Sequence, residues 1–393
     1  MQVSVRLRTG KRPPSNKPPP PDPPPHSYRY PIKLQDADGY PFWVSIPQPD
    51  MISLVGTVRY EHFKSLPSGT PLDELALLVT NTLSSAGATN SQVTVGNTGF
   101  NKGSGVYRSV SWHFGEGAAA INFSIGQSKD ADAAHWLRIE FNPRKLGAKG
   151  IFDLVDAIHD ATGQRFLVGK FLSSCRVTRI DIAVDVIGLS VPELIVTAKS
   201  EAKRVHYYGS DGCLESVYLH KKTSTAKTSE PKPSSRKLGT QIARIYDRRR
   251  ELISSNKQPD YGLVPMTRIE VMKKHFGNKP FELLSLFHLK NPLKDIFVGL
   301  ATSAAPENQW AWLEYVELRR GGGHDWAGRL MSLSDTEEQA YADAYRKHPR
   351  DVLLSDAVWE RWLQGIQSTG LDFMMQAAAA SSAGSSFALE SDE

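Results

Sequence analysis

Four short segments of the chain share a pattern that could bring chemically useful side chains together. In each segment an arginine stands two residues before an acidic residue or a tyrosine, and apolar residues fill the positions around them. Side chains alternate between the two faces of a strand, so the arginine and its acid or tyrosine share one face and the apolar residues share the other. We therefore expect strands with one polar face and one core face at 137–141, 178–186, 243–246 and 267–271.

The acidic residues of this pattern would line one surface if the strands pair in a single sheet. They are Glu140, Asp181, Asp185 and Glu270. Carboxylates on one surface either pair with arginines or bind a hard cation such as Mg²⁺ or Mn²⁺, which can polarise a phosphodiester oxygen. For any single segment, a solvated or salt-bridged strand face is the more common explanation. The repetition in four segments favours a functional surface.

Tyr246 is the candidate nucleophile of this surface. The ordinary pKa of a tyrosine is near 10, so Arg244 or a metal would have to stabilise the developing phenolate. Attack on phosphorus would give a phosphotyrosyl ester and release a 3′-hydroxyl. Taken alone, Tyr246 fits equally well as a half-buried strand tyrosine with its hydroxyl in water.

The elements that would position these residues predict an α+β fold, an antiparallel sheet with packed helices. Apolar residues alternate at 52–58 and 106–112, as expected for antiparallel strands. A helix is expected around 71–86, and a second one around 151–158. A third is expected to begin with Ser190 as its N-cap and Pro192 in its first turn.

Two helices are expected late in the chain. A capping box, Ser334 to Glu337, predicts the first, and Ser355 precedes the second.

Composition divides the chain into four parts. The parts are a proline-rich disordered tail (1–27), a catalytic region (28–275) with a basic insert (221–240), a mostly helical region (276–375) with an accessory or DNA-contacting role, and a disordered Ala/Ser-rich tail (376–393).

Positive charge is clustered rather than spread evenly. The 393 residues contain 47 Lys and Arg against 42 Asp and Glu, a net charge of +5. One cluster is Arg248, Arg249 and Arg250, and another in the insert includes Lys221, Lys222, Lys232 and Lys237. We expect both clusters to contact DNA phosphates.

The cysteine content and the hydropathy pattern exclude several classes of protein. Cys175 and Cys213 have no spacing that would bind zinc or an iron–sulfur cluster, and they fit a reducing cytoplasm. No stretch approaches the roughly 20 apolar residues of a membrane span, so we expect no membrane association.

The motifs resemble, in order, those of the replication initiation factor family. This family contains trans-acting initiators of small rolling-circle plasmids, replication proteins of some filamentous phages, and relaxases of some integrative elements. The resemblance covers roughly residues 50–275. It is carried by 137–146, 178–185, 244–251 and 267–271.

The resemblance implies specific roles for the residues that match. Tyr246 would become linked to the 5′-phosphate of origin DNA, with Arg244 beside it. Glu140, Asp181 and Glu270 would bind Mg²⁺ or Mn²⁺, and Asp185 also matches a family position. The protein would act in the cytoplasm of a bacterial host cell on both double-stranded and single-stranded DNA.

The chain departs from the family pattern just before the nucleophile strand. The family's Tyr-Phe-Gly or Tyr-Ile-Gly segment could correspond to Val217–His220 or to Tyr207–Gly209, so the alignment of 200–240 stays open. The family's usual lysine after the nucleophile is Arg248 here, which keeps the charge but not the geometry.

Other functions remain to be distinguished from replication initiation. A relaxase for conjugative transfer would make the same nick, and a non-cleaving origin-binding protein could retain the fold. A histidine-metal nickase is rejected because no two histidines flank a single residue. No nucleotide-triphosphate loop is visible, so strand separation would depend on supercoiling or a host helicase, with a host single-strand-binding protein as a further partner. A homodimer is compatible with the sequence.

Overall fold

The computed structural model describes a defined part of the chain. The described residues are 32–35, 41–57, 59–62, 93–95, 106–114, 119–127, 135–161, 167–198, 202–210, 214–221, 241–256, 264–274, 276, 280–300, 315–316, 328, 331–346 and 351–382. The expected tail 1–27, the expected helix 71–86 and most of the insert 221–240 lie outside them.

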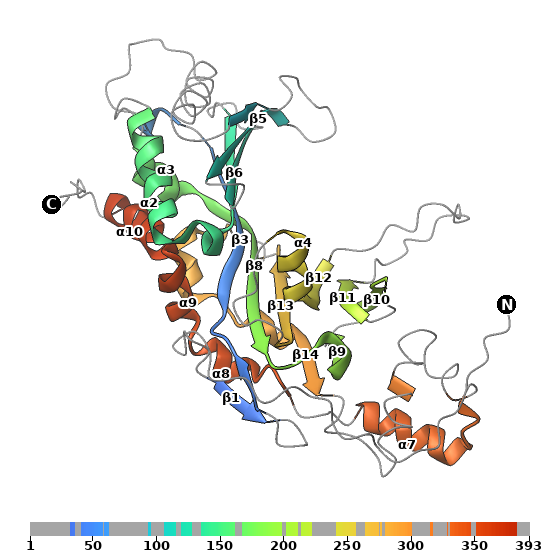
Figure 1. Ribbon diagram of the computed structural model, residues 1–393. Helices are drawn as coiled ribbons and strands as arrows, with labels where there is room; N and C mark the ends of the chain where they lie inside the picture. Colours follow the sequence, from blue (N-terminus) through green and yellow to red (C-terminus); the bar gives the residue numbers. More distant parts are fainter. Residues whose placement is uncertain are drawn as a thin grey trace, which may run out of the picture.

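Antiparallel pairing organises most of the strands into one sheet, shown in Figure 1. The strand order along its main path is β10-β11-β12-β13-β8-β3-β7-β6-β5-β4. The bounds in this order are Ala202–Tyr208, Leu214–Lys221, Gln241–Asp247, Met266–Lys273, Arg176–Ile187, Gln48–Thr57, His135–Phe141, Ala119–Gln127, Val106–Phe114 and Val93–Val95. Off this path, β1 (Ile32–Gln35) pairs with β2 (Pro41–Val44), which pairs with β8. The four motif segments all become strands, as predicted: β7, β8, β12 and β13.

Helices cover one face of this sheet, and the α+β prediction is confirmed. Figure 1 shows α2 (Pro143–Ala161), α3 (Val168–Ser174), α9 (Trp362–Thr369) and α10 (Leu371–Ser382) along one side of β3 and β8. The predicted helix around 151–158 is part of α2. The short helix α4 (Arg248–Ser254) packs against β13, away from this helical layer.

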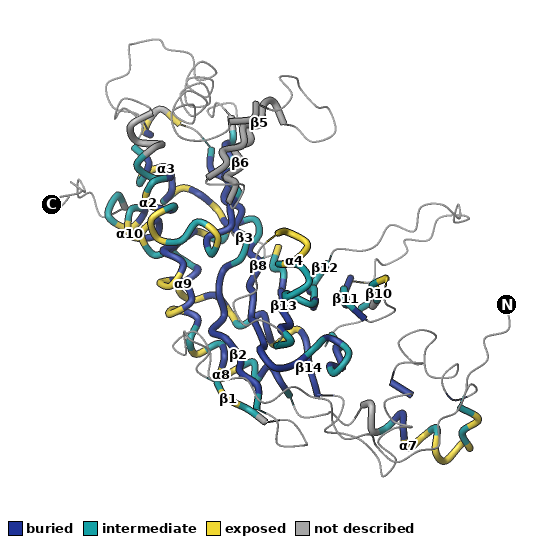
Figure 2. The backbone as a smooth tube through the Cα atoms, in the orientation of Figure 1, coloured by how far each residue is buried: buried dark blue, intermediate teal, exposed yellow. Residues whose placement is uncertain are grey.

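The apolar residues of the motif strands form the core under these helices. Ile139, Ile182, Ile245 and Ile269 are all essentially without solvent exposure and belong to one hydrophobic cluster. The same cluster contains Ile366 of α9 and other side chains of the C-terminal helices. Figure 2 shows the buried track along β3, β8 and β13. The prediction that one face of each motif strand is core is therefore confirmed.

Two glycines allow the helices to lie directly on β3. A side chain at Gly365 of α9 would overlap the backbone carbonyl oxygen of Pro47, just before β3. A Cβ at Gly56 of β3 would lie 2.7 Å from the ring of Phe171 in α3. Real Cβ atoms essentially never approach other atoms so closely. Both helices can therefore pack this close to β3 only because glycine has no side chain.

The prediction of a third helix that begins at Ser190 is wrong. The capping interaction forms, because the Ser190 backbone N–H and hydroxyl donate to Glu193 Oε2 at 2.8 and 2.7 Å. Only a single 3₁₀ turn follows (η4, Val191–Glu193), and the chain continues as β9 (Leu194–Ala198), which pairs with β14 (Ile296–Leu300). The β-branched run Ile195 to Thr197 favours a strand over a helix, and it has a partner strand to pair with.

The C-terminal region is helical but not separate from the sheet. Helix α7 (Asp335–Arg346) begins at the predicted capping box, where the Ser334 hydroxyl donates to Glu337 at 2.7 Å. The region also contains β14, the 3₁₀ turns η5 (Leu283–His288) and η6 (Pro292–Asp295), and α8 (Ser355–Trp359). Helices α9 and α10 pack against α2, α3 and β3.

The prediction of a disordered tail from residue 376 is wrong as far as Ser382, where α10 ends. Ala378 is fully buried, and Gly169 of α3 allows close approach to the backbone of Ala377. Small residues here serve helix packing rather than disorder. No helix within the described ranges is long and apolar enough to cross a membrane.

Candidate active site on the polar sheet face

The strand register brings the polar residues of the motif strands onto one face, in two neighbouring rows. Adjacent residues of the first row pair across the strands from β10 to β8: Tyr207, Ser216, Tyr246, Arg268 and Asp185. The second row runs in the same way: Val205, Tyr218, Arg244, Glu270 and Ala183. The prediction of a shared polar face is therefore confirmed for these strands.

Tyr246 lies at the centre of the first row and is held by residues of the second. Its hydroxyl donates to Glu270 Oε1 at 2.6 Å. The Arg244 guanidinium donates from Nε and Nη2 to the same carboxylate, at 3.1 Å each, and its Cζ lies 4.3 Å from the centre of the Tyr246 ring. Tyr246 is only 7% exposed. The phenol therefore has a fixed orientation and a specific proton acceptor.

The electrostatic setting of Tyr246 favours its neutral form. Burial raises the pKa of Tyr246, and the nearby charges of Glu270 and Glu251 raise it further. Arg244 lowers this pKa, as expected from the sequence, but its effect is the smaller one. Arg244 alone therefore does not produce a resting phenolate.

Glu270 is suited to accept the tyrosine proton. Burial raises the pKa of Glu270, and the charge of Asp50 acts in the same direction, whereas Arg244 and Tyr246 oppose them. A carboxylate with a raised pKa, 2.6 Å from the hydroxyl it would deprotonate, is placed to act as a general base.

A second guanidinium–carboxylate pair lies in the adjoining part of the face and is more deeply buried. Arg268 donates from Nε and Nη2 to Asp185 at 2.6 and 3.0 Å, and from Nη1 to Asp50 at 3.2 Å. Arg144, near the start of α2, pairs with the same Asp185 at 2.9 Å. The side chains of Arg268 and Asp185 are 2% and 4% exposed.

The remaining predicted acids are also paired with arginines. Asp181 accepts from Arg179 Nε at 2.9 Å on the same strand. Glu140 lies 3.8 Å from Arg138 on β7, with both side chains a third or more exposed. Ser53 of β3 separates Glu140 from Arg179 in the register.

This arrangement does not form a metal site within the described residues. No three His, Cys, Asp or Glu side chains described in the structure are grouped so that they could hold a metal ion. Asp181 and Asp185 are four residues apart on one strand, about 13 Å, too far for both to bind one ion at about 2.0–2.6 Å. The predicted ligands Glu140, Asp181, Asp185 and Glu270 are distributed over several arginine pairs rather than gathered around one point.

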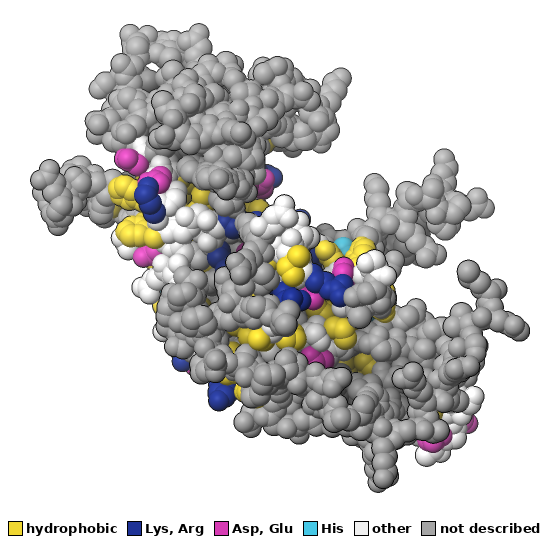
Figure 3. Space-filling view, in the orientation of Figure 1, with side chains coloured by type: hydrophobic (Ala, Val, Ile, Leu, Met, Phe, Trp, Pro, Cys, Tyr) yellow, Lys and Arg dark blue, Asp and Glu magenta, His cyan; other side chains and the backbone are white. Residues whose placement is uncertain are grey.

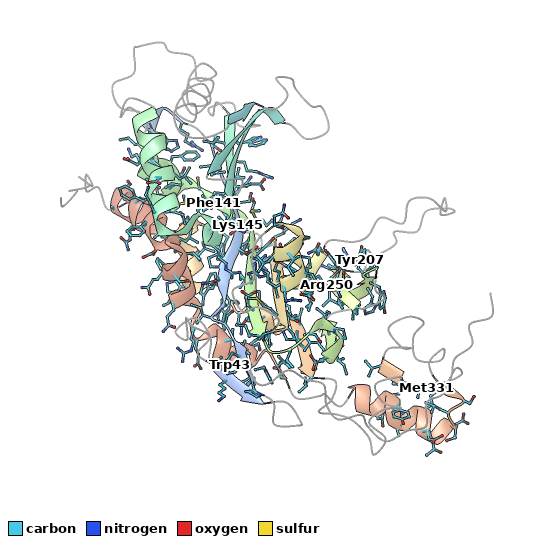
Figure 4. All side chains as sticks on the ribbon, viewed as in Figure 1. Trp43, Phe141, Lys145, Tyr207, Arg250 and Met331 are labelled. Atoms are coloured by element: carbon cyan, nitrogen blue, oxygen red, sulfur yellow. The ribbon has the colours of Figure 1, made fainter. Side chains whose placement is uncertain are left out.

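The predicted phosphate-contacting arginines lie in α4, directly after the tyrosine strand. Asp247 caps this helix by accepting from the Arg250 backbone N–H at 2.9 Å. Arg248 pairs with Glu251, and Arg250 pairs with Glu215 of β11. Figure 3 shows basic and acidic side chains mixed in this part of the surface, and Figure 4 places Arg250 and Tyr207 in the same area.

Not all of the predicted DNA-contacting residues can be placed. Arg249 is partly exposed in α4, and Lys221 is exposed at the end of β11. Lys222, Lys232 and Lys237 lie outside the described residues.

Sequence reasoning missed Asp50 and Arg144 as members of this site. Asp50 belongs to β3, where a register shift between Pro49 and Met51 interrupts the alternation that would have revealed its side. Arg144 stands four residues after Glu140 and is the second residue of α2. Its position within the 137–146 motif was the available signal.

Comparisons with known proteins found no matching family model and no matching curated protein. The resemblance to the replication initiation factor family therefore rests on the four sequence motifs themselves.

Proposed function

We propose that this protein is a rolling-circle replication initiator that nicks one strand of origin DNA by attack of Tyr246, on a phage or plasmid genome in a bacterial cytoplasm. The observation that carries the proposal is the hydrogen bond of 2.6 Å from the Tyr246 hydroxyl to Glu270, with the Arg244 guanidinium over the tyrosine ring and paired to the same acid. Nucleophile, base and cation come from two neighbouring strands.

The proposed reaction follows from these three groups. Tyr246 transfers its proton to Glu270 as its oxygen attacks phosphorus. The new oxygen–phosphorus bond forms while the bond from phosphorus to the 3′-oxygen breaks, and that oxygen takes a proton from solvent. The products are a 5′-phosphotyrosyl link and a free 3′-hydroxyl. The link preserves the bond energy for rejoining, so the nick requires no ATP.

Arg244 supplies the charge that the transition state needs. Its guanidinium is bound to Glu270 at rest, and protonation of Glu270 weakens that pair. The guanidinium then becomes available to the developing charge on the phosphate oxygens. Transfer of the proton and release of the arginine are thus coupled in one step.

We also propose, on the basis of the family resemblance alone, that the nicking reaction depends on Mg²⁺ or Mn²⁺. Such an ion would polarise a phosphodiester oxygen. The carboxylates of this face are bound by arginines, and the proposed reaction uses protein groups alone. Assays with Mg²⁺, with Mn²⁺ and with a chelator test this dependence directly.

Two other functions are compatible with the same face. A relaxase for conjugative transfer would make the same nick, and its DNA would be a transfer region rather than a replication origin. A non-cleaving origin-binding protein would have a neutral, hydrogen-bonded tyrosine, which is the resting state of Tyr246 here. Formation of a covalent adduct distinguishes this second alternative.

The test is covalent capture of supercoiled DNA from the replicon that encodes the protein. We expect a protein–DNA adduct on a denaturing gel with the wild type and with the matched variants Tyr207→Phe, Tyr208→Phe and Tyr218→Phe. Tyr246→Phe should give none, because it lacks the attacking oxygen and keeps the ring. An adduct that survives in Tyr246→Phe contradicts the proposal, and the absence of any adduct under all metal conditions favours the non-cleaving protein.

The arginines of α4 and the basic insert are proposed to hold DNA phosphates. Each phosphate contact that is lost should reduce the slope of log affinity against log salt by about 0.7–0.9. Neutralising Lys221, Lys222, Lys232 and Lys237 together should therefore flatten the salt dependence. An unchanged slope would exclude the insert from phosphate binding.

A further inference from the structure

Aromatic side chains extend the polar face beyond Tyr246 to the edge of the sheet. Tyr207 lies on β10, the end strand in the sheet order, and is 46% exposed. Its ring contacts that of Tyr218 edge to face, with centres 5.0 Å apart. Tyr218 in turn stacks with His220 at 6.3 Å. The reaction proposed above uses none of these rings.

The register connects this aromatic cluster to the proposed nucleophile. Tyr207 pairs with Ser216, and Ser216 pairs with Tyr246, so all three lie in one row. Tyr218 pairs with Arg244 in the neighbouring row. The residue between the two tyrosines of the first row is a small serine, so no large side chain of that row separates Tyr207 from Tyr246.

We infer that Tyr207 and Tyr218 form a stacking platform for unpaired DNA bases beside the scissile phosphate. Exposed aromatic rings bind bases of any sequence by stacking, with arginines holding the backbone, which is the common design of single-strand binding sites. Arg244 and the arginines of α4 provide positive groups next to this platform. This inference rests on the proposed function and specifies the form of DNA that the site takes.

The strand spacing along the row gives the distance between the stacking platform and Tyr246. Two strand spacings of about 4.8 Å separate Tyr207 from Tyr246 at the backbone, about 10 Å in total. Stacked nucleotides rise by about 3.4 Å each, so this distance corresponds to about three nucleotides. Bases on Tyr207 and Tyr218 would therefore hold the strand a few nucleotides from the phosphate that Tyr246 attacks.

Tyr208 provides a matched control within the same strand. It is as exposed as Tyr207, at 46%. A register shift between the two residues pairs Tyr208 with Leu214, whose side chain belongs to the core cluster. Tyr208 is therefore equally accessible but does not belong to the row that contains Tyr246.

The test measures binding of an oligothymidine carrying a single 2-aminopurine, whose fluorescence falls on stacking. All variants are made in a Tyr246→Phe background, so that cleavage cannot affect the readout. We expect quenching with the parent and with added Tyr207→Phe or Tyr208→Ala. Added Tyr207→Ala should bind about 5- to 150-fold more weakly and lose the quenching.

Several results would overturn the platform. These are unchanged binding with Tyr207→Ala, an equal loss with Tyr208→Ala, equal Tyr207 dependence for a duplex, or tighter Tyr207-dependent binding of an RNA oligonucleotide. A change of oligomeric state in both alanine variants, with DNA binding unchanged, would identify the β10 edge as an interface between copies of the chain. Because the readout needs no nick, failure of the platform can be told apart from failure of Tyr246 as nucleophile.

Discussion

Two guanidinium–carboxylate pairs on the same sheet face have similar geometry but different surroundings. In one, Arg244 and Glu270 are 33% and 9% exposed, and the acid also accepts the Tyr246 hydroxyl. In the other, Arg268 and Asp185 are almost completely buried, and the acid also binds Arg144. Both arginines come from the same sequence pattern, in which an arginine stands two residues before a tyrosine or an acid.

The difference shows how one strand pattern can serve chemistry in one row and stability in the next. The acid of the first pair touches a group that can react, and its arginine reaches solvent and so can meet a phosphate. The carboxylate of the second pair binds the guanidinium groups of Arg268 and Arg144. The backbone N–H of the same Asp185 donates to the Ser45 hydroxyl at 2.8 Å, which fixes this part of the strand. We therefore assign a role in the reaction to Glu270 and a role in the stability of the folded sheet to Asp185.

The largest expected effect separates the two acids by activity. Glu270→Gln removes the proton acceptor of Tyr246, and the adduct should form about 10²- to 10⁴-fold more slowly. Burial raises the pKa of Glu270 above its ordinary 4.5, and only the carboxylate accepts a proton. The wild-type rate should therefore rise with pH through this raised pKa, and that rise should be absent from the variant. A variant with the wild-type pH profile would remove Glu270 from the reaction.

The second effect separates them by stability. Asp185→Asn leaves Arg268 buried without its full counter-charge and should lower the free energy of unfolding by about 3–5 kcal/mol in denaturant titrations. The combined Asp185→Leu and Arg268→Met replacement should recover part of this loss, because it removes both charges. If Asp185→Asn were stable but formed no adduct, the two assignments would be reversed.

A smaller effect is expected at the third pair, Arg179 and Asp181, which is about as exposed as the pair of Arg244 and Glu270. Arg179 is about a third exposed, so solvent screens its interaction with Asp181. Asp181→Asn should cost about 1 kcal/mol of stability by the same titration. A loss of stability as large as that of Asp185→Asn would show that burial of the arginine does not determine how much each pair contributes to stability.

The smallest effect is expected at the surface pair beside α4. A Cβ on Gly209 would lie 2.6 Å from Arg250 Nη1 and would overlap Glu215, so Gly209→Ala must displace this pair. Both partners are well exposed, and the stability should change by less than about 1 kcal/mol. The rate of adduct formation should stay within roughly twofold. A large loss of DNA binding would show that Arg250 holds a phosphate only while it is paired with Glu215.

The strands and their shared face could be predicted because strand alternation is a local property. Spacing alone predicts that Arg179 shares a strand face with Asp181 and that Arg268 shares one with Glu270, and the pairing register agrees. Which residues stand opposite one another depends on how distant strands align, and no single strand contains that information. The pairing of Arg268 with Asp185 therefore became visible only in the structure.

The errors in the prediction have the same origin. The cap at Ser190 is a local signal for a helix, but the pairing of β9 with β14 outweighs it. The small residues near Ala378 predict a disordered tail from composition, although close packing against α3 also requires small residues. The seven-residue helix α3 was not predicted, since its stability comes from packing rather than from its own short sequence.

The central claim is that Tyr246 is the residue that becomes joined to DNA. The most direct measurement is proteolytic digestion of the trapped adduct, followed by mass spectrometry of the peptide that carries the nucleotide. We predict a 5′-phosphate ester on Tyr246, in the peptide that contains Ile245 and Asp247. A nucleotide on Tyr207, Tyr208 or Tyr218 instead would contradict this account.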